Sequence, residues 1–167
     1  MTKDMKETRA DQLTLLKNLL SSTNDTNYVR VLYAAWASAL TTGSRYVIDL
    51  VKAEIDEPTE SQRRDIEFAI ARMGVTNPYF IAKQFVEVNA GGSLESLNFK
   101  SFASLNVEDE VAYHHACVAI SLINGGHMCL RSHVGSLQQA GVPDPEIDAT
   151  MRLAAVCHSL KILASIE

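Results

Sequence analysis

The sequence of 167 residues predicts an all-α protein, and three observations support this class. Apolar residues recur with the helical period of about 3.6 along nearly the whole chain. No stretch alternates polar and apolar residues for long enough to form a convincing strand. Glycine and proline divide the chain into segments of helical length. We expect one domain over residues 1–167, in which residues 1–26 form a polar N-terminal segment with a short helix.

The first helices are expected along the N-terminal third of the chain. Thr14–Ser21 is amphipathic and predicts a short helix. Tyr28–Leu40 is apolar nearly all round, as a central buried helix should be. Gly43 breaks this helix, and Ser44 is suited to cap the next one, which is expected to run to about Ile55.

Two further helices are expected before the middle of the chain. Thr59 and Gln62 have the spacing of a capping box and open the first of them. Gly74 is a suitable residue just past its end. The second is expected to begin at Pro78, since proline favours the first helical position, and to end near residues 89–92.

A long loop and three helices are expected in the remainder. Residues 91–106 form the one long irregular stretch. Asn106 is expected to cap a helix that runs to about Asn124, where a pair of glycines interrupts the pattern. A helix over residues 127–140 follows, and the last helix begins at Pro145 and runs to the C-terminus.

A weak internal repeat relates the two parts of this pattern. The segments ASALTTG and AISLING align at an offset of 82 residues, and each is followed by glycine, helix, turn and helix. Under this alignment Val47 takes the place of Cys129, and Val51 takes the place of His133. One half would then keep the scaffold while the other carries the reactive groups. The alternative is that any two helical hairpins resemble each other in this way.

Composition excludes several classes of protein. Apolar residues make up 47% and charged residues 21%, as in soluble globular chains, and a net charge of −5 argues against a nucleic-acid partner. No apolar run of about 18 residues exists, so no membrane partner is expected. The polar N-terminus lacks an apolar signal core, so the chain is expected in the cytoplasm. The three cysteines are odd in number, which disfavours a disulfide framework.

All cysteines and histidines lie between His114 and His158, so any chemistry is expected in the C-terminal half. Cys129 falls in the first turn of a predicted helix, where an anionic thiolate is stabilised. His133 follows at i+4 on the same face, and can hydrogen-bond the thiol or, when protonated, stabilise the thiolate. If the two helices form a hairpin, His114 can approach this face and relay a proton. These three residues are the candidate catalytic group.

The cysteines and histidines also have structural and metal-binding interpretations. Cys117 and Cys157 are expected to be inert core residues, because free cysteine is among the most buried residue types. The candidate catalytic group could instead hold zinc or copper, with His127 as a fourth ligand. The spacing matches no compact zinc motif, so neither a metal nor another cofactor is expected.

The run ISLINGGHMCLRSHVGSLQQAGV resembles the alkylhydroperoxidase D family, within the carboxymuconolactone decarboxylase-like group. The pattern of that family is a glutamate on one helix, then asparagine-glycine, then CxxCxxxH at the start of the next helix. Asn124-Gly125, Cys129 and His133 match it. Arg72–Glu87 and the C-terminal ASIE also resemble the family, so the resemblance covers roughly residues 28–167.

The resemblance implies an all-α fold of two related helical halves and a homo-oligomer, a trimer or a multiple of one. It also implies that the protein reduces alkyl hydroperoxides or passes electrons to a peroxiredoxin partner. Two departures matter: Gly126 replaces the first cysteine of the CxxC, and His114 replaces the glutamate of the proton relay. Without the CxxC disulfide, the expected cycle oxidises Cys129 to a sulfenic acid that an external thiol resolves.

Two other functions are compatible with the same residues. The chain could be an inactive member of the family, kept as an oligomeric binding or scaffold protein. It could also carry a decarboxylase-like or metal-dependent reaction at the histidine-rich pocket. The reactivity of Cys129 near neutral pH discriminates between these alternatives, since a scaffold requires no reactive thiol.

Overall fold

The computed structural model describes residues 7–166, and these residues form seven α-helices and no β-strand, which confirms the predicted all-α class. The helices are α2 (Ala10–Ser21), α3 (Tyr28–Thr42), α4 (Arg45–Glu54), α5 (Glu60–Phe85), α6 (Glu110–Asn124), α7 (His127–Gln139) and α8 (Asp144–Ser165). Two short 3₁₀ helices, η1 (Glu95–Leu97) and η2 (Phe102–Leu105), lie between α5 and α6. None of the helices in the described part of the chain is long and apolar enough to cross a membrane.

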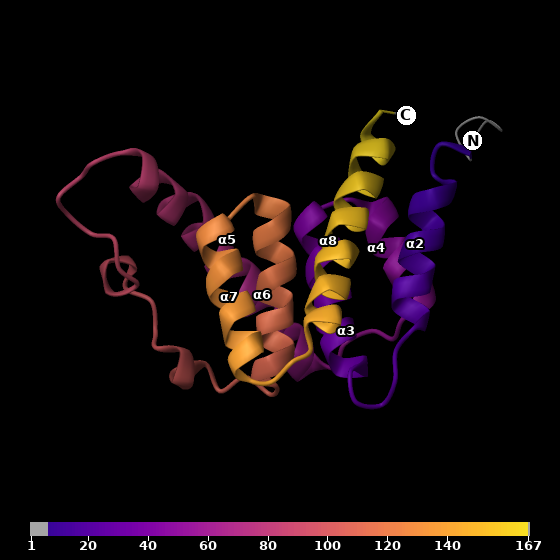
Figure 1. Cartoon of the computed structure of the whole chain (residues 1–167), viewed down its shortest axis with the longest axis horizontal. Helices are drawn as coiled ribbons and strands as arrows, with labels where there is room; N and C mark the ends of the chain where they lie inside the picture. The colour runs from indigo at the N-terminus through magenta and orange to yellow at the C-terminus, as the bar shows by residue number, and fades with distance from the viewer. Residues whose placement is uncertain (1–6, 167) are drawn as a thin grey trace.

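Helices α3 and α6 pack against each other at the centre of the molecule. Helices α5 and α7 lie beside α6, whereas α2, α4 and α8 gather on the other side of α3 (Figure 1). The segment between α5 and α6 loops out from the helical body on the left of Figure 1. Most of its residues from 86 to 101 are exposed.

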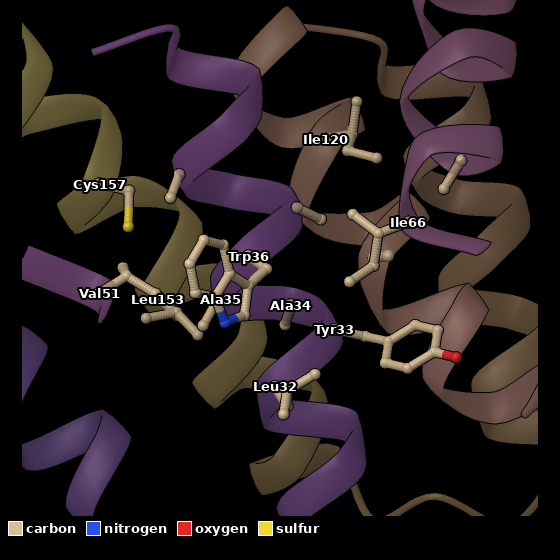
Figure 2. Packing of buried hydrophobic residues seen from close by; sticks show 14 of the residues in the cluster. Leu32, Tyr33, Ala34, Ala35, Trp36, Val51, Ile66, Ile120, Leu153 and Cys157 are labelled. Atoms are coloured by element: carbon tan, nitrogen blue, oxygen red, sulfur yellow. The ribbon is translucent and has the colours of Figure 1, made fainter. Parts of the chain in front are cut away.

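The hydrophobic core surrounds α3. Every residue from Leu32 to Ala39 is buried, which explains why this helix is apolar nearly all round. Figure 2 shows α3 passing through the core, with Val51 and Cys157 on one side and Ile66 and Ile120 on the other. Apolar burial from both sides therefore holds the two groups of helices together.

The helix boundaries repeat at the offset seen in the sequence. Helix α3 spans Tyr28–Thr42 and α6 spans Glu110–Asn124, so both ends are displaced by 82 residues. Each is closed by a glycine in the left-handed conformation, Gly43 at φ 66° and Gly125 at φ 70°. This agreement supports the interpretation of the chain as two related helical halves.

The expected break at Gly74 and the expected helix start at Pro78 are wrong, because α5 continues through both residues. Pro78 lacks an N–H and leaves the carbonyl of Gly74 without its helical partner. Gly74 is exposed, so water can satisfy that carbonyl. Met73 and Asn77 are buried against α6, and this packing outweighs the local cost of the proline.

The start of α6 also differs from the expectation. Asp109, not Asn106, caps this helix, and its side chain accepts a hydrogen bond of 2.9 Å from the N–H of Ala112. Asn106 has a left-handed backbone with φ 48° and ends η2 instead. The capping box of Thr59 and Gln62 is confirmed, with both reciprocal hydrogen bonds formed.

Candidate active site

The α6–α7 hairpin brings the candidate residues together. Gly125 ends α6, and the N–H of Gly126 donates to the carbonyl of Ser121 at 2.7 Å, which closes the turn. Helix α7 then begins at His127, so Cys129 lies in its first turn as predicted. The Cys129 side chain is almost fully buried in the hairpin.

A cavity of about 560 Å³ opens beside this hairpin, between α5, α6, α7 and the loop before α6. Cys129, His133 and His114 all line it. The remaining walls are largely apolar, with Met73, Phe80, Leu94, Phe102, Tyr113 and Met128 among them. The structure therefore places all three predicted residues around one space of the size that small molecules occupy.

The two histidines are hydrogen-bonded to each other. Nδ1 of His114 lies 2.9 Å from Nδ1 of His133, so one nitrogen donates and the other accepts. Phe102 stacks on the His114 ring, with ring centroids 5.7 Å apart and planes at 23°. The second nitrogen of His114, Nε2, lies 3.7 Å from Oε1 of Glu110, one helical turn earlier. The aromatic contact and the hydrogen bond fix the position of the His114 ring.

Burial keeps both rings neutral. The pKa of His133 is lowered to about 4, mainly by burial and further by His114 and by the charge of Arg72. Burial also lowers the pKa of His114, while the nearby Glu110 carboxylate partly opposes this shift. At pH 7 His133 is therefore a hydrogen-bond acceptor or base, and the expected alternative, a protonated imidazole beside the thiolate, is disfavoured.

The other two cysteines, Cys117 and Cys157, are buried core residues. Burial raises the pKa of the Cys157 thiol to about 12 and also raises that of Cys117. Neither residue lines the cavity beside the hairpin. Both are free and buried, as expected for inert core residues.

Sequence reasoning missed a cation in this cavity, Arg72 of α5. Its Nη1 donates to the carbonyl of Lys100 at 3.0 Å, and its guanidinium lies 5.1 Å from the ring centroid of Phe99. The charge of Arg72 also acts to lower the pKa of His133 and of Tyr113. Arg72 begins the middle segment that resembles the family, but helical periodicity alone does not show which wall of a cavity it faces.

The space beside Gly126, the residue expected to replace the first cysteine of a CxxC, is filled by a side chain of α5. Gly126 is buried, and a Cβ added to it would lie 2.7 Å from Cβ of Asn77, which is too close for a real contact. Asn77 donates to Oγ of Ser121 at 3.1 Å and accepts from Nδ2 of Asn124 at 3.1 Å. The backbone at Gly126 is not the obstacle, since its φ is −80°. The Asn77 side chain therefore excludes a cysteine at residue 126 in this conformation.

The proposed metal ligands do not form a cluster. Within residues 7–166, no group of three or more histidine, cysteine, aspartate or glutamate side chains is placed to hold a metal ion. His127, the expected fourth ligand, is exposed, and its Nε2 contacts Oε1 of Gln84 outside the cavity. The residues present therefore do not fit a metal centre of the expected kind.

Comparison with known proteins relates part of this sequence to one family. Residues 109–163, which comprise α6, α7 and most of α8, match the carboxymuconolactone decarboxylase family. The chain is 36% identical over 103 residues to "Alkyl hydroperoxide reductase AhpD" of Caulobacter vibrioides (strain NA1000 / CB15N). That match covers 61% of this chain and 56% of the relative, so the chain spans little more than half of that relative's length.

Longer matches connect the chain to proteins of the same name. The protein from Coxiella burnetii (strain RSA 493 / Nine Mile phase I) is 27% identical over 152 residues, 88% of this chain and 84% of the relative. The protein from Maricaulis maris (strain MCS10) is 24% identical over 135 residues, 78% of this chain and 76% of the relative. The all-α fold, the family match over α6 to α8 and these relatives together support an AhpD-like protein of the carboxymuconolactone decarboxylase family.

Proposed function

We propose that the protein is a thiol peroxidase that reduces organic hydroperoxides through a single reactive cysteine, Cys129. The main observation is the cavity that this cysteine lines together with two hydrogen-bonded histidines. The other cysteines lie outside the cavity and have raised pKa values. The name of the relatives, alkyl hydroperoxide reductase, supports this class of substrate.

A proton path accounts for the paired histidines. If Nδ1–H of His133 donates to Nδ1 of His114, then Nε2–H of His114 faces the Glu110 carboxylate. This tautomer leaves Nε2 of His133 free to accept the proton of the Cys129 thiol, one turn away on α7. Glu110, at the solvent side of His114, stabilises the pair when it becomes protonated.

The atoms and electrons of the oxidation step are all accounted for by the thiol and the hydroperoxide. The Cys129 thiolate attacks one oxygen of the hydroperoxide, an S–O bond forms, and the O–O bond breaks. The leaving alkoxide takes the proton from the histidine pair and departs as an alcohol. Cys129 becomes a sulfenic acid in the first turn of α7, where the positive end of the helix dipole stabilises its anionic form.

An external thiol completes the cycle. Gly126 provides no resolving sulfur, and the second cysteine of the hairpin, Cys117, is buried outside the cavity. A small thiol condenses with the sulfenic acid to give a mixed disulfide and water. A second thiol then releases Cys129 as a thiol and leaves as the external disulfide, so two electrons enter for each peroxide reduced.

The direct test is the oxidation of the protein by cumene hydroperoxide, followed by trapping of sulfenic acid with dimedone and peptide mass spectrometry. We expect the adduct at Cys129, and none in the Cys129→Ser variant. Cys157→Ser is the matched control and should retain the adduct, because Cys157 lies outside the cavity. Oxidation of Cys129 no faster than that of Cys117 would contradict the proposal and favour a scaffold role.

A further inference from the structure

We infer that Arg72 makes the cavity selective for anionic hydroperoxides, in which a carboxylate is attached to an apolar body. This inference rests on the proposed function, because it names the class of peroxide that Cys129 reduces. It also predicts a binding property that can be measured when no reaction takes place.

The first argument is the unused hydrogen-bonding capacity of Arg72. A guanidinium carries five N–H donors, and the structure shows one of them, on Nη1, bound to the Lys100 carbonyl. No carboxylate in the described part of the chain forms an ion pair with Arg72, whereas Arg30, Arg45, Arg63 and Arg152 each have one. A half-buried cation without a counterion favours an anionic ligand.

The second argument is the position of Arg72 relative to the other charge on the cavity wall, Glu110. Asp65 of α5 accepts from the N–H of Glu108, and Asn77 of α5 donates to Ser121, so α5 and α6 run side by side in the same direction. Arg72 is therefore about five residues, or roughly 8 Å, further along this direction than Glu110. Glu110 is largely exposed and well solvated, so its charge is screened from an anion at Arg72.

The third argument is the character of the other walls of the cavity that Arg72 and Cys129 line. Phe80, Phe102 and Tyr113 contribute rings, and Met73 and Met128 contribute flexible thioether side chains. These surfaces suit an aromatic or alkyl body, while the guanidinium suits a planar carboxylate through two parallel hydrogen bonds. The loop that holds Arg72, through Phe99 and Lys100, fixes the guanidinium before a ligand arrives.

The test compares cumene hydroperoxide bearing a para-carboxylate with the methyl ester of the same compound. We expect the wild-type protein to have a kcat/KM about ten- to hundredfold higher for the carboxylate, the usual effect of a charge-assisted hydrogen-bond pair. Arg72→Met should remove this preference, and Arg72→Lys should keep part of it. Arg131→Met is the control, since Arg131 is an exposed residue of α7 that does not line the cavity.

The ratio of the two substrates is independent of the fraction of folded protein, so a partly unfolded variant remains informative. Equal kcat/KM values in the wild type would overturn the inference. An equal loss for both substrates in Arg72→Met would show that Arg72 acts on the thiol and not on the carboxylate.

A binding measurement separates this inference from the proposed function. The unreactive probe is 4-isopropylbenzoate, titrated by calorimetry into the Cys129→Ser protein with and without Arg72→Met. Binding that requires Arg72 supports the anion site even if no peroxide is reduced. Absence of binding to the Cys129→Ser protein overturns the anion site, whatever the activity of the wild type.

Discussion

The two halves of the molecule, α3–α5 and α6–α8, share helix order and offset but differ in what their second helices carry. In the first half Val47 and Val51 of α4 are fully buried in the core. The equivalent residues of α7, Cys129 and His133, line a cavity instead. The same backbone arrangement therefore forms part of the core in α4 and part of a cavity wall in α7. The difference lies in the side chains and in what packs against them.

The comparison extends to the first helix of each half. Tyr33 and His115 occupy equivalent positions, and both are fully buried rings with a polar atom. Tyr33 donates to Asp65 at 3.1 Å, whereas Nδ1 of His115 lies 2.7 Å from Oγ1 of Thr150. Each half thus gives a buried polar ring one hydrogen bond of its own, although Nε2 of His115 is buried without a hydrogen-bond partner. Four changes test how far the halves are interchangeable.

The largest effect is expected from Asp65→Ile, which introduces the residue found at the equivalent position, Ile147. The Asp65 carboxylate is fully buried and accepts from Tyr33 and from the N–H of Glu108 at 2.7 Å. Its loss leaves the buried Tyr33 hydroxyl and the partly buried N–H of Glu108 unpaired, so the free energy of unfolding should fall by about 3 kcal/mol. Urea denaturation measures this. Asp49→Ala, at an exposed pair, should change stability by less than about 0.5 kcal/mol; equal costs would contradict this account.

The second effect concerns the exchange of valine and histidine between the halves. Val51→His places an imidazole in a fully buried apolar site and should cost about 2–3 kcal/mol. The reverse change, His133→Val, should cost less than about 1 kcal/mol, because His133 lies on a cavity wall and its partner His114 can bind water there. Thermal unfolding of both variants measures the two losses of stability. Similar losses would show that the cavity is not what distinguishes the halves.

The third effect concerns Gly126, for which the first half has Ser44. Gly126→Cys should destabilise the protein by about 2 kcal/mol, because the new side chain meets Asn77. The position equivalent to Asn77 is Ser159, so Asn77→Ser should relieve the clash. We expect a coupling free energy of at least about 1 kcal/mol in the double-mutant cycle. The double variant should also form a disulfide between residues 126 and 129 on oxidation. Additive costs would show that Asn77 does not exclude the cysteine.

The smallest effect is a pH dependence. His115 is fully buried and His133 is partly buried, and each has its pKa lowered to about 4, whereas both titrate near 6.5 when unfolded. The unfolded state therefore binds more protons at acid pH, so stability is lost as pH falls from about 6.5 toward 4. By pH 6 each histidine should cost about 1 kcal/mol relative to pH 8. Urea unfolding at both values should show a smaller loss in His133→Val than in the wild type; an equal loss would contradict the neutral ring.

The features that the sequence predicts well are those set by residues close together in the chain. The capping box of Thr59 and Gln62 and the left-handed glycines Gly43 and Gly125 define helix ends through their own hydrogen bonds and backbone preferences. The i+4 spacing of Cys129 and His133 likewise follows from helical geometry alone. Helix class and most boundaries could therefore be predicted before the fold was known, as could the grouping of Cys129, His133 and His114 around one space.

Other features depended on residues far apart in the chain. Helix α5 continues through Gly74 and Pro78 because Met73 and Asn77 pack against α6, more than forty residues away. The neutral state of His133 follows from burial against α5 and α6, which no local pattern specifies.

Sequence alone thus determined the helices and the order of the reactive groups, since these depend on backbone conformation and periodicity. Tertiary structure decided what surrounds those groups: Arg72 lies on the wall of the cavity, and Asn77 fills the space beside Gly126. The physical reason is that charge, burial and steric fit are properties of side chains brought together from different helices, and these contacts form only when the helices pack.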